Sequence, residues 1–207
     1  MIIFKPFLKL FYLTEMKLKN KITIITGASS GIGKALAIAM AEEGAKVILA
    51  ARSKDKLEAV ITDLNYQGYE AVAIQTDVSN ENDCKNLILS TVDKFGKIDI
   101  LINNAGISMR ALFKDTKIEV LKKLMDINFW GMVYCTKYAM PYLLESKGSV
   151  VGVSSIAGYK GLPGRTGFSS SKFAMHGFLE SLRIENLKTG LHVLLACPGF
   201  TASNIRN

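Results

Sequence analysis

The residues whose type and spacing most clearly indicate ligand binding are three glycines within the eight residues from Thr26 to Gly33, which read TGASSGIG. Glycine lets a chain turn tightly and approach a ligand, and the free amides at a helix N-terminus attract phosphate groups. An apolar stretch precedes this run and an amphipathic stretch follows it, as in the strand–turn–helix units that bind a dinucleotide pyrophosphate. The spacing therefore predicts a dinucleotide site. The alternative is that the glycines only turn the chain.

The second chemical signal is Arg52, in the segment Ala51-Arg52-Ser53 that follows the next apolar stretch. In dinucleotide-binding units an acidic residue at this place binds the ribose 2′-hydroxyl of NAD, whereas an arginine accommodates the 2′-phosphate of NADP. Because a guanidinium pairs strongly with phosphate and no carboxylate stands here, we expect the cofactor to be NADP(H). The alternative is that Arg52 only caps a solvated loop.

These residues must be positioned by the strands and helices that alternate from Lys19 onwards. The expected strands are Lys21–Thr26, Lys46–Ala50, Glu70–Gln75, Ile98–Ile102, Ser149–Ser154 and His192–Ala196. The expected helices are Gly31–Glu43, Lys54–Gln67, Glu81–Phe95, Lys117–Glu145 and Thr166–Thr189. Apolar strands between amphipathic helices are typical of α/β folds with a doubly wound parallel sheet. We expect one Rossmann-type domain over residues 16–207, with ligands at the strand carboxyl ends, after an N-terminal extension over residues 1–15.

Further motifs follow the later strands in order. They are Asp77-Val78 after the third strand, Asn103-Asn104-Ala105-Gly106 after the fourth, and Pro198-Gly199 with Thr201 after the sixth. With the glycine run, and spread from Lys19 to Ser203, they resemble the short-chain dehydrogenase/reductase family. The resemblance implies that NADP(H) is bound by residues from all these turns and the last helix: Gly27, Ser29, Ser30, Gly31, Ile32, Gly33, Arg52, Asp77, Val78, Asn104, Ala105, Gly106, Lys172, Pro198, Gly199 and Thr201.

The resemblance also locates the family's catalytic Asn, Ser, Tyr and Lys. It assigns Asn128 on the long helix, Ser155 after the fifth strand and Lys172 on the next helix. The tyrosine position, four residues before Lys172 on the same helix face, holds Phe168. By resemblance Lys172 would hold the nicotinamide ribose, Ser155 would bind the substrate oxygen and Asn128 would support a water relay.

Phe168 changes the chemistry that the family implies. The family's tyrosine exchanges a proton with the substrate oxygen while hydride passes to or from the nicotinamide, and the lysine cation lowers the tyrosine pKa. Phenylalanine has nearly the same volume but no hydroxyl, so the fold and cofactor site should persist while acid/base chemistry fails. We expect an NADP(H)-dependent oxidoreductase acting between an alcohol and a carbonyl, with impaired turnover. The alternatives are a non-catalytic NADP(H)-binding protein and rescue by the nearby Tyr159.

The C-terminal part of the sequence bears on the substrate and on assembly. Relatives usually continue past the sixth strand into a substrate-covering segment and a seventh strand, whereas this sequence stops at Asn207. We therefore expect six strands without the usual seventh, an apolar edge at Leu191–Ala196, and either a fragment or an unusually short member. The resemblance implies a homodimer or homotetramer through the two long helices, although their apolar residues would equally cover the sheet.

The composition is that of an ordinary globular domain, with 49% hydrophobic and 21% charged residues. The net charge is +8, but the lysines are spread along the chain without interleaved aromatics, which disfavours a nucleic-acid partner. Three cysteines without a CxxC pair and two isolated histidines indicate no metal site and a reducing cytoplasm. Lys5, Pro6 and Lys9 interrupt residues 1–15, which fit a loose extension or a peripheral membrane anchor better than a bilayer span.

Overall fold

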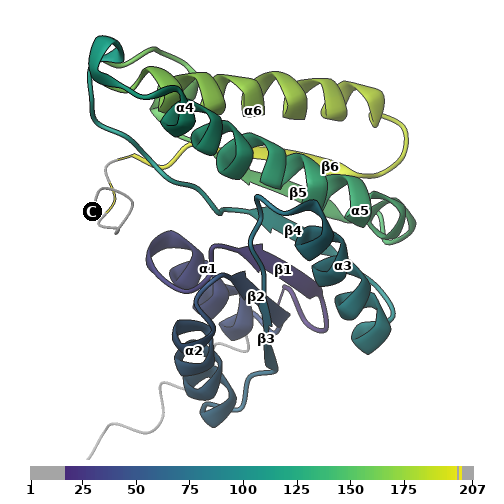
Figure 1. The fold of residues 1–207 in the computed structure, drawn as a ribbon. Coiled ribbons are helices and arrows are strands. Elements are labelled where there is room, and N and C mark those ends of the chain that lie inside the picture. Colours follow the sequence, from purple (N-terminus) through teal and green to yellow (C-terminus); the bar gives the residue numbers. More distant parts are fainter. Residues whose placement is uncertain (1–16, 200, 202–207) are drawn as a thin grey trace, which may run out of the picture.

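Six parallel strands form one sheet in the computed structural model, which describes residues 17–199 and 201 (Figure 1). The strands are β1 (Ile22–Thr26), β2 (Lys46–Ala51), β3 (Ala71–Gln75), β4 (Ile100–Asn103), β5 (Ser149–Val153) and β6 (His192–Ala196). Their order is β3-β2-β1-β4-β5-β6, and every neighbouring pair is parallel. This arrangement confirms the predicted doubly wound, Rossmann-type sheet. The strand order reverses between β1 and β4, which is where such sheets bind ligands.

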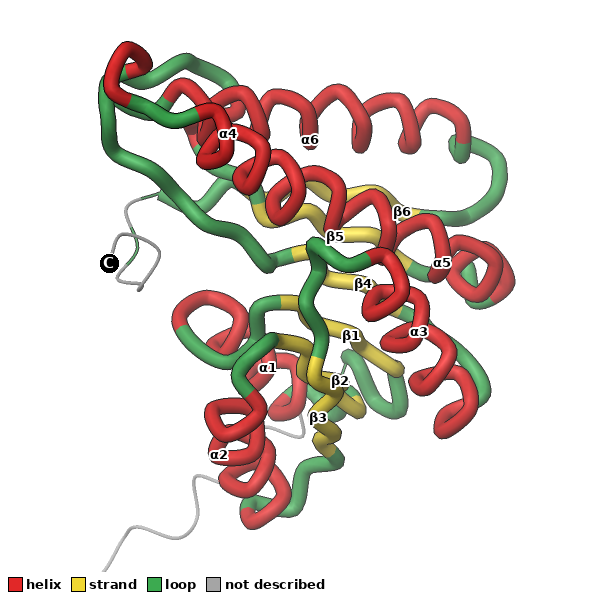
Figure 2. The backbone as a smooth tube through the Cα atoms, in the orientation of Figure 1, coloured by secondary structure: helices red, strands yellow, loops and turns green. Residues whose placement is uncertain are grey.

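Helices cover both faces of the sheet, as Figure 2 shows. Side chains of α1 (Gly31–Glu42) and α2 (Lys54–Tyr66) pack on one face, and those of α3 (Glu81–Phe95), α5 (Gly131–Glu145) and α6 (Thr166–Glu185) pack on the other. The shorter elements are η1 (Phe113–Asp115), α4 (Ile118–Met125), η2 (Asp126–Trp130) and η3 (Ile156–Gly158). Central strands are therefore buried on both sides, and all five residues of β1 are buried.

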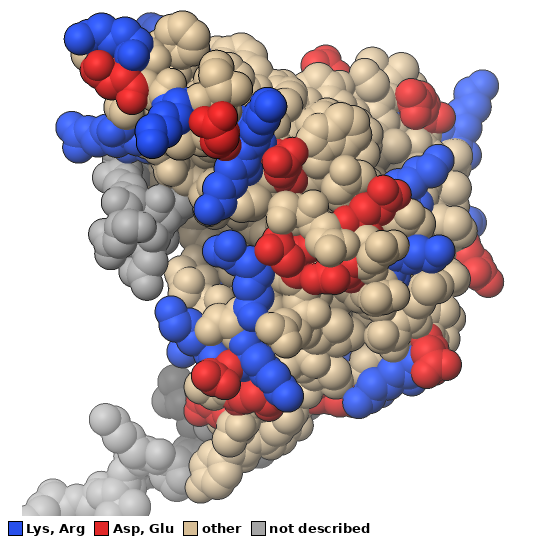
Figure 3. All heavy atoms as spheres, viewed as in Figure 1, with Lys and Arg blue, Asp and Glu red and all other residues tan. Residues whose placement is uncertain are grey.

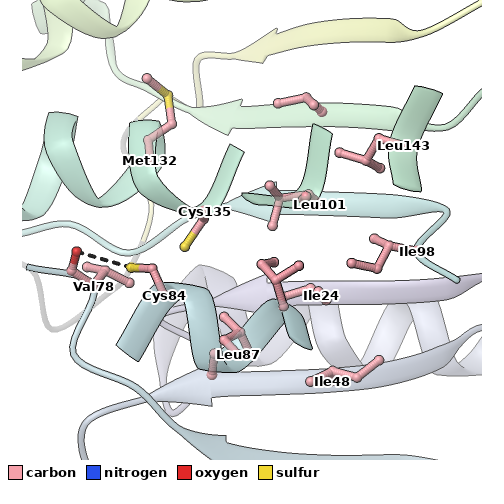
Figure 4. Packing of buried hydrophobic residues seen from close by; sticks show 14 of the residues in the cluster. Ile24, Ile48, Val78, Cys84, Leu87, Ile98, Leu101, Met132, Cys135 and Leu143 are labelled. Carbon is pink, nitrogen blue, oxygen red and sulfur yellow. Dashed lines mark hydrogen bonds between the residues drawn. The ribbon is translucent and has the colours of Figure 1, made fainter. Parts of the chain in front are cut away.

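The core on the α3 and α5 side joins aliphatic side chains of β1, β2 and β4 to two cysteines on facing helices (Figure 4). The Cys84 thiol on α3 donates a hydrogen bond to the Val78 carbonyl oxygen, at 3.4 Å. The neighbouring Cys84 thiol and complete burial raise the pKa of the Cys135 thiol on α5. Both cysteines therefore act as small buried apolar side chains.

The long helix expected over Lys117–Glu145 is interrupted, which corrects the prediction. It consists of α4, the π-helical turn η2 and α5, and it begins at Ile118. A π turn inserts one residue into a helix and leaves no signature in hydrophobic spacing over so short a segment.

Several predicted boundaries also move by one to four residues. The last helix ends at Glu185 and not at Thr189, because Asn186 leaves helical geometry with φ of −112°. The fourth strand begins at Ile100 and not at Ile98, since the preceding Asp99 carboxylate is buried and accepts a hydrogen bond from the Ile22 amide at 2.9 Å. The other strands and helices shift by one residue at an end or match the prediction, as α3 and β6 do.

The described surface carries both signs of charge. On the face in Figure 3, lysines and arginines are interspersed with aspartates and glutamates rather than gathered in one block.

Within residues 17–199 and 201, no helix has the length and apolarity needed to cross a bilayer. The extension expected over residues 1–15 lies outside the described residues. At the far edge of the sheet, β6 leaves Leu194 more than half exposed.

Candidate functional site

The turn from β1 to α1 is shaped so that a phosphate can come close to the backbone. Gly27 has a φ of 66°, which residues with a side chain rarely adopt. A Cβ atom at Gly33 would overlap the Gly27 carbonyl oxygen, so both positions require glycine. The Ser30 side chain makes no capping hydrogen bond, and the first turn of α1 holds no acidic residue. The positive amide end of α1 is thus left for an anion.

Asn104, after β4, ties its loop to this turn. Its side-chain Nδ2 donates to the carbonyl oxygens of Thr26, at 2.9 Å, and Gly27, at 3.2 Å. The amides of Asn104 and Ala105 in turn donate to the Thr26 hydroxyl, at 3.1 and 3.0 Å. A side chain on Gly27 would come within 2.8 Å of the Ala105 Cα atom. The two loops at the switch in strand order therefore form one rigid unit.

A cavity of about 780 Å³ opens over this unit. It is lined at the end of β2 by Arg52 and Ser53, and at the start of α2 by Lys56. These groups are two cations and a hydroxyl, which suit a phosphate. Eleven of the predicted cofactor residues line this cavity, namely Gly27, Ser29, Ser30, Gly31, Ile32, Arg52, Asp77, Val78, Asn104, Ala105 and Gly106. Its size and its glycine cradle fit a dinucleotide.

Asp77 is the acidic residue in this cavity and follows β3. Its carboxylate accepts hydrogen bonds from the Ser79 hydroxyl, at 2.7 Å, and the Ser79 amide, at 3.0 Å. Burial raises the pKa of Asp77, but the Ser79 hydrogen bonds and the Arg52 charge together outweigh it and lower the pKa. Asp77 is thus ionised at neutral pH and held by its own loop.

A second, smaller cavity of about 190 Å³ adjoins the first, since Ile32, Asn104, Gly106 and Ser108 line both. Four of the five remaining predicted cofactor residues lie here, namely Lys172, Pro198, Gly199 and Thr201, and so do Ser155 and Phe168. The structure thus brings three of the four predicted catalytic positions to one cavity. Gly33 lies beneath the glycine turn, and Asn128 lies behind the loop that follows β4.

Lys172, on α6, is almost completely buried beside this cavity. Its Nζ donates to the Val153 carbonyl oxygen at 2.9 Å and lies 3.3 Å from the Met175 sulfur. Burial lowers the pKa of Lys172 to about 8. With three N–H donors, the ammonium keeps one more for a ligand. Lys172 is therefore a cation that gives up its proton more readily than an exposed lysine does.

Asn128 lies in the π turn η2 and uses its amide to fix the chain around the site. Its Oδ1 accepts from the Ile107 amide at 2.8 Å, and its Nδ2 donates to the Ile107 carbonyl oxygen at 3.0 Å. The same Nδ2 donates to the Ser171 hydroxyl at 2.9 Å. Asn128 thus connects the loop after β4 to α6, beside Lys172. π turns of this kind are frequent at functional sites.

Ser155, in the turn after β5, and Phe168, on α6, line the small cavity. The Ser155 hydroxyl accepts a hydrogen bond from the Ala157 amide at 3.2 Å, which keeps its proton available for donation to a ligand. The Phe168 ring is 6% exposed and packs with Met109, Leu124 and Ala157. No polar atom of this side chain can contribute to the cavity.

Tyr159 does not line either cavity. Its side chain is 67% exposed, and its ring packs edge-on against His176 with centroids 4.4 Å apart. The His176 Nε2 lies 2.7 Å from the Ser154 hydroxyl. Tyr159 therefore packs over a histidine and does not share the cavity that Ser155, Phe168 and Lys172 line.

Six polar residues that line these cavities were not predicted from the sequence: Ser53, Lys56, Thr76, Ser108, Ser154 and Arg165. Ser53 and Lys56 flank Arg52 at the larger cavity, and Ser108 and Arg165 lie at the smaller one. The sequence contains a signal for Lys56 as a second phosphate-binding cation, because it lies four residues after Arg52, in the first turn of the following helix. Ser108 and Arg165 come from loops that only the tertiary fold brings together, where the Arg165 guanidinium donates to the Ser108 hydroxyl.

Comparisons with known proteins agree with this geometry. The family model of short chain dehydrogenases matches residues 21–207. A curated relative, the 11-beta-hydroxysteroid dehydrogenase-like 2 protein of Arabidopsis thaliana, is 43% identical over 188 residues, which are 90% of this chain and 61% of the relative. The chain thus spans less than two thirds of that protein's length.

Two solved structures share the fold and about a quarter of the sequence. A short chain dehydrogenase/reductase from Burkholderia phymatum, solved in complex with NAD, has a TM-score of 0.88 and 28% identity, and covers 91% of this chain and 68% of its own. An actinorhodin polyketide ketoreductase variant, solved with NADPH, has a TM-score of 0.87 and 28% identity, and covers 90% of this chain and 72% of its own. These matches, the sheet order and the two adjoining cavities lead to one assignment. The chain belongs to the short chain dehydrogenase family.

Proposed function

We propose that this protein is an NADP(H)-dependent oxidoreductase that moves hydride between an alcohol and a carbonyl, with turnover limited by Phe168. The observation that carries the proposal is the pair of adjoining cavities. The larger one has cations at the end of β2, and the smaller one has Ser155 and Lys172 on its wall. The proposal gives the first cavity to the phosphate-bearing part of the cofactor, and the second to the nicotinamide end of the cofactor together with the substrate.

The preference for NADP(H) rests on the groups at the end of β2. Arg52, Ser53 and Lys56 are exposed there and offer N–H and O–H donors to a 2′-phosphate. A carboxylate at the same place would bind the 2′-hydroxyl of NAD and repel a phosphate. Asp77 does not take that role in the proposal, because Ser79 already occupies one of its oxygens.

The proposed roles at the second cavity follow from the hydrogen bonds that each side chain can still donate to a ligand. Bound NADP(H) supplies or accepts the hydride. Lys172 keeps one N–H donor for the ribose next to the reacting ring, and Ser155 points a hydroxyl proton at the substrate oxygen. Asn128 positions this machinery, because its hydrogen bonds fix the loop after β4 and α6.

Phe168 leaves the substrate oxygen without a side-chain acid at the tyrosine position. A positioned acid or base contributes about 10²–10⁴ in rate, so we expect turnover below that of a tyrosine-bearing chain by a comparable factor. A titration with NADPH and NADH, followed by activity assays on a panel of ketones, tests the proposal. We expect NADPH to bind more tightly, with slow oxidation of NADPH. Equal affinity for the two cofactors would refute the assignment of Arg52.

A second function is favoured by the packing of the Phe168 ring, which is buried in an apolar cluster. In this reading the protein binds NADP(H) without turnover. The two functions differ in the response to Phe168→Tyr. The enzyme gains measurable activity on at least one ketone, whereas the binding protein binds NADPH and stays inactive.

We also propose that two copies associate through the faces of η2, α4 and α6. Trp130 and Phe173 are more than 40% exposed on these elements, and Ile184 is more than 60% exposed. A contiguous patch of exposed apolar side chains is typical of association surfaces, and the proposal places these three side chains in one such patch. Light scattering of the purified protein should give the mass of a dimer or tetramer, and a monomer at micromolar concentration would contradict the proposal.

A further inference from the structure

We propose that the second cavity takes a small carbonyl compound that also carries a carboxylate, and that Arg165 binds this carboxylate. The inference rests on the proposed function, because it names the substrate class of that same site. It assigns Arg165 as a residue that determines specificity and leaves hydride transfer to the groups named above.

Arg165 reaches the cavity from the residue before α6. Its Nη1 donates to the Ser108 hydroxyl, which belongs to the loop after β4 and lines both cavities. Its Cζ atom also lies 5.9 Å from the centroid of the Phe168 ring. Two separate elements therefore hold the guanidinium at the cavity wall. A guanidinium has five N–H donors, so donors remain for a ligand after the bond to Ser108.

The charge of the cavity is unbalanced. Its lining contains two cationic side chains, Arg165 and Lys172, and no carboxylate among residues 17–199 and 201. Arg165 takes part in none of the ion pairs that the described residues form. A partly buried guanidinium near a second cation is unfavourable without an anion, which makes an anionic ligand the natural partner.

The neighbouring helix end adds to the same potential. α6 is 20 residues long, begins directly after Arg165 and has no acidic residue in its first turn. The N-terminus of such a helix carries partial positive charge. Arg165 and the helix end therefore both favour an anion on this side of the cavity.

The dimensions of the cavity favour a short ligand. Its volume of about 190 Å³ is below the roughly 300–1,000 Å³ of pockets for drug-sized ligands. Lys172 Nζ and Arg165 Cζ each lie 5.9 Å from the Phe168 ring centroid, so they are no farther apart than twice that distance. Ile156, Leu162 and Phe168 supply apolar wall. A short oxo acid can place its carboxylate at Arg165, its methylenes on this wall and its carbonyl at Ser155.

Binding to the protein saturated with NADP⁺ tests the inference without requiring turnover. The probes are 4-oxopentanoate and 6-oxoheptanoate, each compared with its methyl ester, by calorimetric titration. We expect at least one acid to bind tenfold or more tightly than its ester. Arg165→Gln should weaken binding of that acid about ten- to a hundredfold, as expected for a charge-assisted hydrogen bond, and leave NADP⁺ binding unchanged.

Matched variants separate recognition from structure. Arg110→Gln removes an exposed cation outside both cavities and should leave the acid affinity unchanged. Arg165→Lys keeps the charge but loses the planar fork, so it should retain part of the preference even if Arg165→Gln folds poorly. If Arg165 served only to hold the loop at Ser108, Ser108→Ala would abolish the preference as well, and the inference would be wrong.

The remaining outcomes distinguish this inference from the proposed function. If NADP⁺ binds but the acids bind no better than their esters, or neither binds, the oxo-acid assignment is overturned and the cofactor assignment stands. If NADP⁺ and NADPH do not bind in the first titration, the proposed function itself fails.

Discussion

Replacing Phe168 by tyrosine restores one hydroxyl at the cavity wall and changes little else. The ring already lies at the cavity with its centroid 5.9 Å from Lys172 Nζ. The new hydroxyl would face the same cavity as Ser155 and Lys172, and the nearby cation would lower the tyrosine pKa. A positioned acid contributes about 10²–10⁴ in rate, which corresponds to about 3–5 kcal/mol of the barrier. We expect Phe168→Tyr to raise the rate of NADPH oxidation by that factor.

The assay requires that the Phe168→Tyr protein remains folded, so the free energy cost of the new buried hydroxyl matters. A buried hydroxyl without a partner costs about 1–3 kcal/mol, but here the cavity and Lys172 are available to it, so the loss should fall at the lower end. Single-turnover oxidation of NADPH, followed by absorbance with a panel of ketones with and without carboxylates, measures the gain. Phe173→Tyr is the matched control, since Phe173 lies on α6 with nearly half of its side chain exposed. No gain in a folded variant that binds NADPH would mean that the missing hydroxyl at position 168 does not limit turnover.

Three further changes test the rest of the site. Arg52→Gln should weaken NADPH binding about tenfold or more and leave NADH binding unchanged, as measured by fluorescence titration. Gly33→Ala should lower the melting temperature and abolish cofactor binding, because its methyl group overlaps the Gly27 carbonyl oxygen. Lys172→Met should alter the pH dependence of stability. The native pKa of about 8 lies below the ordinary lysine pKa of 10.5, so the unfolded chain holds more protons between these two pH values. Wild type should therefore gain about 3 kcal/mol relative to Lys172→Met as the pH rises from about 8 to 10.5, by urea unfolding.

Each of these changes has a result that contradicts its reason. Equal losses of NADPH and NADH affinity in Arg52→Gln would mean that the guanidinium supports the loop and not a phosphate. Normal cofactor binding by Gly33→Ala would mean that the turn relaxes without cost. A constant stability difference between wild type and Lys172→Met over that pH range would mean that Lys172 is not desolvated in the native state.

The sequence predicted the sheet and the larger cavity well because both depend on local patterns. The glycine run and the segment at Arg52 are each one continuous stretch of sequence. Each follows an apolar strand, and the fold places both at the carboxyl ends of strands, beside the larger cavity. The contribution of Arg165 was not predictable, because Arg165 and Ser108 are 57 residues apart and meet only through packing. The burial that shifts the Lys172 pKa likewise comes from surrounding elements, and the spacing to Phe168 does not reveal it.

The π turn at Asp126–Trp130 sets the relative rotation of the two helices that it joins. α4 packs against α6, beside the small cavity, whereas α5 packs against α3 over the sheet. One residue of an α-helix corresponds to a rotation of about 100°, so closing the turn by deleting a single residue would swing one of these faces away from its partner. The length of this segment is therefore constrained as well as the identity of Asn128, and a family member that lost one residue here would have to repack either the side that faces the small cavity or the side that faces the sheet.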